Sequence, residues 1–300
     1  MFHKILMPYD GQELSMEILP YVVLFSKTLG IPTLVLSVKD PDALDLPVDL
    51  RMMAGPWERE LTERLRQVTE KLSAKGVNVS SMIEYGRAHR RILEIAEQED
   101  CDLIALSTHG RGFLNWVALG SVTYHTLHRS TVPVLAVSPH AEPAGYEIAA
   151  QLSRIVVPLD GSALAETALP YAEYLASRFS IPVQIVRAVR SRAELPGVLA
   201  RSISAEAEQE AFEEIEAYLE NVTGPMKSRG LDASWKVLKG SAGYEIVREA
   251  ASVANTMIAM TTHGKSGLLP GVLGSTSISV LRNASVPVLV IPPPTASATA

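Results

Sequence analysis

The chain has 300 residues, of which 47% are apolar and 20% charged, and its formal net charge is −6. This composition is typical of a soluble globular protein, and a mildly acidic chain without clusters of Lys and Arg argues against nucleic-acid binding. The single cysteine, Cys101, excludes a disulfide framework and a cysteine-based metal cage. No apolar run approaches the roughly 18 residues of a spanning helix, and no signal-peptide pattern opens the chain. We therefore expect a cytoplasmic protein that binds neither nucleic acid nor membrane.

The sequence contains a long internal repeat. Pro8 to Gly11 (PYDG) is matched 150 residues later by Pro158 to Gly161 (PLDG). Further along the separation is 154, as between Gly86 and Gly240, so the second copy carries four extra residues after its second predicted strand. Copies of this length suit the usual size of a domain and are far longer than solenoid units. We predict a first domain at 1–139, a linker at 140–152 and a second domain at 153–293.

Within the first copy, short apolar runs alternate with amphipathic stretches. The runs predict buried strands at 5–7, 34–38, 77–83, 103–106 and 134–137. Between the second and third strands, apolar residues recur every three or four positions from Trp57 to Leu72, which predicts a helix ending at Gly76. The corresponding helix of the second copy, around 212–222, is expected to end or kink at Gly224-Pro225. Alternating strands and helices with right-handed crossovers predict that each copy is a five-stranded, doubly wound, parallel α/β domain.

The last predicted strand of each copy is apolar along its whole length. These segments are 132–137 and 286–291. An open apolar edge invites aggregation unless it is covered. We expect the two edges to cover each other, so that the chain is an internal pseudo-dimer; a further homodimer is left open.

The most distinctive repeated motif is a glycine-containing loop after the fourth predicted strand. His109-Gly110, nine residues and Gly120-Ser121 in the first copy are matched by His263-Gly264, nine residues and Gly274-Ser275 in the second. A helix is predicted to begin near Val122, and the unpaired amides of a helix N-terminus attract phosphate. Ser121 could cap this helix or bind a ligand oxygen.

Asp10 and Asp160 follow the first predicted strand of each copy. Ligands of open α/β sheets bind outside the carboxyl ends of strands, where the winding direction reverses. If the first and fourth strands are neighbours, the aspartate and the glycine loop face one crevice. Asp-Gly alone is a common turn pair, but a carboxylate for ribose hydroxyls together with bare amides for phosphate describes a nucleotide site.

These motifs resemble the universal stress protein family in its tandem form. Nucleotide-binding members carry an early aspartate at a strand end, and Gly-x-x-Gly, nine residues, then Gly-Ser or Gly-Thr. The resemblance implies strand order 3-2-1-4-5, pairing of the last strands, a role in the stress response, and ATP or another adenine nucleotide, with any Mg²⁺ held by the phosphates. The expected nucleotide-binding residues are Pro8, Asp10, Val38, Ser107, His109, Gly110, Gly120, Ser121 and Val122 in the first copy and Pro158, Asp160, Ala188, Thr261, His263, Gly264, Gly274, Ser275 and Thr276 in the second.

One departure from the family pattern keeps other functions open. Ser107 and Thr261 stand where the motif has its first glycine, so the chain could instead be a nucleotide-free interaction scaffold. A weak ATPase is a further alternative, and the segment 259–266 (AMTTHGKS) is a degenerate match to the phosphate loop of NTPases.

No catalytic or metal-ligating residue is predicted. His109 and His263 lack a partnered nucleophile and are interpreted as residues that fix the loop. His125 and His128 lie three residues apart on a helix, but further metal ligands are lacking. We expect a protein that binds nucleotide rather than a catalyst.

Overall fold

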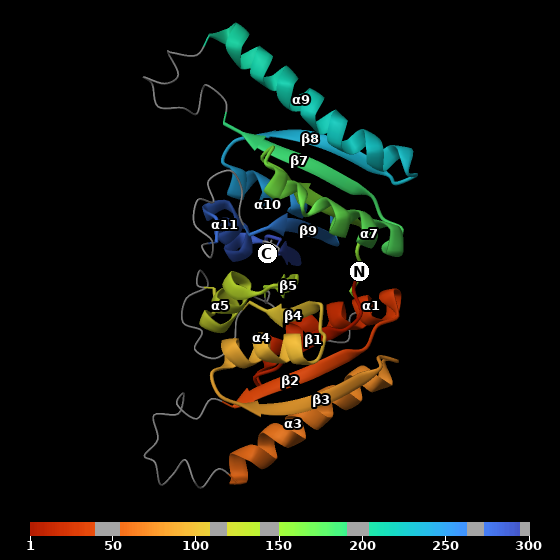
Figure 1. Cartoon of the computed structure of the whole chain (residues 1–300), viewed down its shortest axis with the longest axis vertical. Helices are drawn as coiled ribbons and strands as arrows, with labels where there is room; N and C mark the ends of the chain where they lie inside the picture. The colour runs from red at the N-terminus through yellow and green to blue at the C-terminus, as the bar shows by residue number, and fades with distance from the viewer. Residues whose placement is uncertain (40–54, 109–118, 139–149, 191–203, 263–272, 295–300) are drawn as a thin grey trace, which may run out of the picture. The chain divides into compact units, whose positions relative to one another are not determined.

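The computed structural model describes residues 1–39, 55–108, 119–138, 150–190, 204–262 and 273–294 (Figure 1). The chain divides into two compact units, Met1–Gln151 and Leu152–Ala300, and each is described by itself. The domain and linker boundaries at 139, 140, 152 and 153 and the pairing of the two last strands stay predictions. Among the described helices, none combines the length and apolar character that a membrane span requires.

The first unit alternates strands and helices from end to end (Figure 1). Its elements are β1 (Ile5–Pro8), η1 (Glu13–Ile18), α1 (Leu19–Leu29), β2 (Thr33–Lys39), α3 (Gly55–Ala74), β3 (Val79–Tyr85), α4 (Ala88–Gln98), β4 (Leu103–Ser107), α5 (Ser121–Arg129) and β5 (Val134–Val137). The strands are parallel in the order β3-β2-β1-β4-β5. All five predicted strands are present, with the third shifted from 77–83 to Val79–Tyr85, and the order 3-2-1-4-5 is confirmed.

The second unit repeats this arrangement. Its elements are β6 (Arg154–Pro158), α6 (Ala163–Glu166), α7 (Leu169–Phe179), β7 (Val183–Val189), α9 (Ala205–Ser228), β8 (Ala233–Lys239), α10 (Ala242–Ala251), β9 (Thr256–Thr261), α11 (Ser275–Asn283) and β10 (Val288–Ile291). Parallel pairing runs in the order β8-β7-β6-β9-β10. Each unit is therefore a five-stranded doubly wound α/β domain.

The core of each unit lies along its inner strands. Every residue of β4 and of β9 is buried, and in β1 only Pro8 is partly exposed. A strand can be buried at successive positions only if both faces of the sheet are covered, which explains why these strands are continuous apolar runs without alternation. The edge strands β3 and β8 are less buried: β3 has no buried residue, and β8 alternates between more and less exposed residues over its first five positions.

The expected end of the second long helix at Gly224-Pro225 is wrong. Helix α9 continues through Gly224 and Pro225 and ends at Ser228, with Arg229 as its C-cap residue. A proline inside a helix removes one backbone hydrogen bond, but here it stands in the last turn, where little of the helix follows. Leu219 and Met226, on either side of the proline, are both fully buried, so packing of this face outweighs the local cost.

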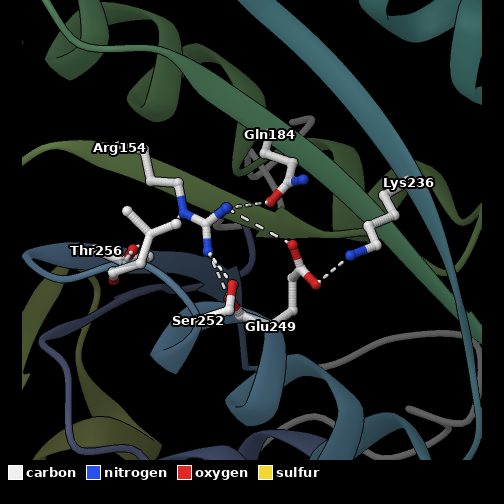
Figure 2. Close-up of polar contacts among 7 residues, drawn as sticks. Arg154, Gln184, Lys236, Glu249, Ser252 and Thr256 are labelled. Atoms are coloured by element: carbon white, nitrogen blue, oxygen red, sulfur yellow. Dashed lines mark hydrogen bonds and ion pairs between the residues drawn. The ribbon is translucent and has the colours of Figure 1, made fainter.

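A partly buried polar network distinguishes the second unit (Figure 2). Arg154, at the start of β6, donates hydrogen bonds from Nε to Thr256 (3.0 Å) and from Nη1 to Gln184 (2.9 Å). Its Nη1 lies 3.6 Å from Oε1 of Glu249, whose Oε2 accepts a hydrogen bond from Lys236 at 2.7 Å. The side chains of Arg154 and Glu249 are only 12% and 9% exposed. The pKa of Glu249 is lowered, because the neighbouring cations Lys236 and Arg154 outweigh the burial that would raise it.

Candidate functional site

The aspartate of each unit begins a tight turn at the carboxyl end of the first strand. The amide of Tyr9 bonds to Leu36 and that of Leu159 bonds to Val186, both at 2.8 Å, and these are the last ladder bonds before the backbone turns. The next glycine of each unit has a φ of about +80°, which residues with a β-carbon rarely adopt. This geometry fixes where the carboxylate that follows each strand is placed.

The two carboxylates sit in similar turns with different support. Oδ1 of Asp10 accepts a hydrogen bond from the amide of Gln12 at 3.0 Å. Oδ1 of Asp160 accepts from both the amide (3.0 Å) and the hydroxyl (2.6 Å) of Ser162. That hydroxyl also accepts a bond from the amide of Ala165 and so caps α6. The plain turn predicted for Asp-Gly is therefore present, and in the second unit it is more firmly held.

The glycine loops begin and end in the same way in both units. The amide of Gly120 donates to the carbonyl of Thr108 at 3.0 Å, and that of Gly274 donates to the carbonyl of Thr262 at 2.8 Å. The hydroxyl of Thr123 binds the carbonyl of Ser107 at 3.2 Å. These bonds hold the first turn of α5, and equally of α11, against the end of the fourth strand. Thr108 and Thr262 were not predicted as site residues, although their repetition 154 residues apart is visible in the sequence.

The helix after the first loop begins at Ser121, next to the predicted start near Val122, and the helix after the second loop begins at the matching Ser275. Ser121 is the first residue of α5, Gly120 is its N-cap, and no side chain caps the helix. The predicted capping role of Ser121 is therefore wrong, because a cap must precede the first helical residue. The same holds for Gly274 and Ser275 in α11. Amides of the first turn have no acceptor within a helix, and a glycine cap brings no side chain to satisfy or cover them.

Ser107, which replaces the first glycine of the family motif, carries a buried hydroxyl. The residue is 9% exposed, and within the described part of the chain its Oγ atom has no hydrogen-bond partner. A buried hydroxyl without a partner costs free energy, so such an atom commonly marks a place where a ligand or water binds. Thr261 is the matching residue of the second unit and is also buried.

Strand order brings the predicted residues of each unit to one edge of the sheet. Because β1 lies between β2 and β4, the end of β1 with Asp10 is flanked by Val38 and by Ser107. The second unit places Asp160 between Ala188 and Thr261 in the same way. The predicted residues Pro8, Val122, Pro158 and Thr276 belong to these strand ends and first helical turns. The loop residues His109, Gly110, His263 and Gly264 lie outside the described residues.

Among the described residues, other histidine and cysteine side chains lie elsewhere in the fold. His125 lies beside His89 of α4, with ring centroids 4.8 Å apart, and Tyr124 stacks on His128. In the described ranges, no group of three or more His, Cys, Asp or Glu side chains is arranged to hold a metal ion. Burial raises the pKa of the Cys101 thiol to about 11, so the thiol stays protonated at neutral pH and is a poor nucleophile.

Comparisons with known proteins agree with this architecture. The model of the universal stress protein family matches the chain twice, at residues 1–138 and 152–292. Universal stress protein Rv2005c of Mycobacterium tuberculosis is 27% identical over 270 residues, which cover 87% of each chain. Universal stress protein MJ0577 of Methanocaldococcus jannaschii is 31% identical over 155 residues, covering 46% of this chain and 95% of the relative.

A solved universal stress protein from Archaeoglobus fulgidus shares the fold over almost the whole length. Its TM-score is 0.70 at 24% identity, covering 97% of this chain and 96% of that one. The fold is thus that of a two-domain α/β protein with universal stress protein repeats. The chain belongs to the universal stress protein family, and it carries the family's domain twice.

Proposed function

We propose that this tandem universal stress protein binds ATP or another adenine nucleotide at the carboxyl ends of the strands in one or both units. It would act in the stress response as a cytoplasmic nucleotide-binding module, with Mg²⁺ held by the phosphates, and bind nucleotide without fast turnover. The observation that carries the proposal is the pairing, in each unit, of a strand-end carboxylate with an uncapped helix N-terminus. Asp10 and Gly120 flank the ends of adjacent strands, as do Asp160 and Gly274.

The chemistry of these residues fits the two ends of a nucleotide. A carboxylate at a strand end can accept hydrogen bonds from the hydroxyls of a ribose. The first-turn amides of α5 and α11 can bind phosphate, aided by the helix dipole. In the first unit, the hydroxyl of Ser107 provides a further buried group that a ligand could satisfy.

The direct test is calorimetric titration of ATP into protein freed of bound nucleotide, with mass spectrometry of any ligand carried through purification. We expect Asp10→Asn and Asp160→Asn each to weaken one site by about 10-fold to 100-fold, the value of a charged hydrogen bond. Asp232→Asn is the matched control, since it removes one exposed carboxylate at the amino end of β8. A folded wild-type chain that binds neither ATP, ADP nor AMP would contradict the proposal and favour the scaffold alternative.

Turnover is tested separately from binding. Release of phosphate from ATP and Mg²⁺, measured on the same protein, is expected to stay close to the uncatalysed background. Sustained release that Asp10→Asn and Asp160→Asn both abolish would identify the chain as an ATPase.

A further inference from the structure

Each Asp-Gly turn has an arginine beside it, but the two arginines come from different elements. In the first unit, Arg64 reaches the turn from α3 and donates a hydrogen bond from Nη1 to the carbonyl of Gly11. In the second unit, Arg187 reaches it from the carboxyl end of β7. Its Nη1 lies 2.9 Å from the point where a β-carbon of Gly161 would stand. The residue equivalent to Arg187 in the first unit is Ser37, 150 positions earlier.

Arg187 is held in place by an aromatic platform. Its guanidinium carbon lies 5.4 Å from the centre of the Tyr218 ring, within range of a cation–π interaction. The hydroxyl of Tyr218 donates a 2.7 Å hydrogen bond to Glu166 of α6. Burial, followed by this bond to Glu166, raises the pKa of Tyr218, so the ring stays neutral. The arrangement presents a fixed guanidinium next to the turn that carries Asp160.

The charges of the two arginines are balanced differently. Arg64 is exposed, and its Nη2 forms an ion pair with Glu60 at 2.6 Å. Arg187 is partly buried, and within the described part of the chain no carboxylate lies within ion-pair distance of its guanidinium. A guanidinium that is partly removed from water, and that no described carboxylate pairs with, is suited to bind an anion with two parallel hydrogen bonds.

The order of the strands indicates which anionic group of a nucleotide Arg187 would bind. β7 and β9 lie on opposite sides of β6. The helix N-terminus proposed for the 5′-phosphates follows β9, whereas Arg187 stands on β7 beside the proposed ribose ligand Asp160. The 5′-phosphates would therefore extend away from Arg187, and a substituent on the ribose would point toward it.

We propose that Arg187 binds a phosphate carried on the ribose, so that the second unit prefers adenine nucleotides with a 2′- or 3′-phosphate. Asp160 binds the remaining hydroxyl. This inference rests on the proposed function, because it assigns the ligand class of the same site. The first unit, with Ser37 at this position and Arg64 paired with Glu60, has no such preference.

The experiment compares three ligands by calorimetry: 5′-AMP, adenosine 2′,5′-bisphosphate and adenosine 3′,5′-bisphosphate. It uses the full chain carrying Asp10→Asn, which weakens the first site. We expect one bisphosphate to bind at least about 10-fold more tightly than 5′-AMP, as a charge-assisted phosphate contact predicts. The two bisphosphates distinguish the 2′ from the 3′ position. Arg187→Ser should bring the ratio of the affinities for the bisphosphate and for 5′-AMP close to one. Arg187→Lys should leave an intermediate ratio, because lysine keeps the positive charge but lacks the two parallel N–H donors of the guanidinium.

Arg64→Ser is the matched control, since it removes the other turn arginine and should leave the ratio unchanged. Equal binding of all three ligands, or an equal loss for all three in Arg187→Ser, would overturn the ribose-phosphate inference while nucleotide binding itself stood. If none of the three binds a folded wild-type chain, the proposed function fails as well. Circular dichroism of Arg187→Ser and Arg187→Lys verifies that both variants fold.

Discussion

The two units share their backbone geometry at the carboxyl ends of the strands, although the arginines beside the turns differ, and they differ more deeply at the amino ends. At the carboxyl ends, both have an aspartate turn with a left-handed glycine, and both tie the residue before the helix to a buried threonine carbonyl. At the amino end, the second unit joins Gln184, Lys236 and the buried Glu249 to Arg154 in one polar network, as Figure 2 shows. The first unit has Leu34, Met82 and Ile95 at the three matching positions. The two units therefore share their backbone geometry where a ligand is proposed, but they differ in whether the side chains at the amino end are apolar or polar.

One fold can therefore hold either apolar or polar side chains at the same positions, provided that every buried polar group finds a partner. In the first unit, Lys4 at the position of Arg154 pairs with Glu99 at 2.8 Å, near the surface. In the second unit the partner, Glu249, lies one helical turn earlier and is buried. A buried ion pair is costly to break and contributes little net stability when compared with a well-packed apolar alternative.

The largest expected effect is that of Glu249→Ala. It leaves the buried guanidinium of Arg154 without a carboxylate, so we expect the free energy of unfolding to fall by about 3 kcal/mol. Urea denaturation, monitored by circular dichroism, measures this free energy of unfolding. The control takes three apolar side chains from the first unit, Gln184→Leu, Lys236→Met and Glu249→Ile, and combines them with Arg154→Met, so that no charge of the network remains. This variant should be as stable as the wild type, and a loss larger than that of Glu249→Ala would contradict the argument.

A smaller effect is expected where α10 and α11 cross. A β-carbon on Gly243 would lie 2.3 Å from Oγ and 2.6 Å from Cβ of Ser279. Since Cβ is also too close, a new rotamer of Ser279 cannot relieve the clash. Gly243→Ala should therefore destabilise the chain by about 1–3 kcal/mol, although alanine favours helix. In the first unit His89 and His125 occupy the matching positions, 4.8 Å apart, so the helices cross there around two large side chains.

The control for the predicted effect of Gly243→Ala is a double-mutant cycle with Ser279→Gly. Gly243→Ala should cost nothing further in a chain that already carries Ser279→Gly, because the glycine removes both clashing atoms. Thermal unfolding of the four chains measures the coupling. Additive losses would show that the contact between α10 and α11 is not responsible.

Much of the fold could be predicted from the sequence because it depends on local patterns. Apolar runs located the strands, and the repeated Asp-Gly and Gly-Ser pairs located the turns and helix starts. Helix α9 was mispredicted at Pro225 because the burial of Leu219 and Met226 depends on packing against the sheet, which no local propensity includes. Tertiary contacts decided the outcome there.

The parts of the site that escaped prediction depend on distant elements. Arg187 and Arg64 reach equivalent turns from β7 and α3, so aligning the two copies does not pair them. Their shared place appears only when the sheet and the long helix are assembled. The network around Glu249 was missed for the same reason, since isolated polar residues within strands resemble an exposed face. The aspartates and glycine pairs, in contrast, were found because both copies repeat them.

The smallest expected effect concerns pH and only the first unit. Burial, followed by the charges of His125 and Arg129, lowers the pKa of His89 below its ordinary value of 6.5. A histidine with a lowered pKa is charged more easily in the unfolded chain, so its contribution to stability is complete above pH 6.5 and decreases as the pH falls through that value. The ring is partly exposed and screened, so the loss should be about 1 kcal/mol at most. NMR titration of the imidazoles measures the pKa directly. His125→Ser, which installs the residue of the second unit, should move the pKa of His89 back toward 6.5, and an unchanged pKa would mean that His125 is not among the causes.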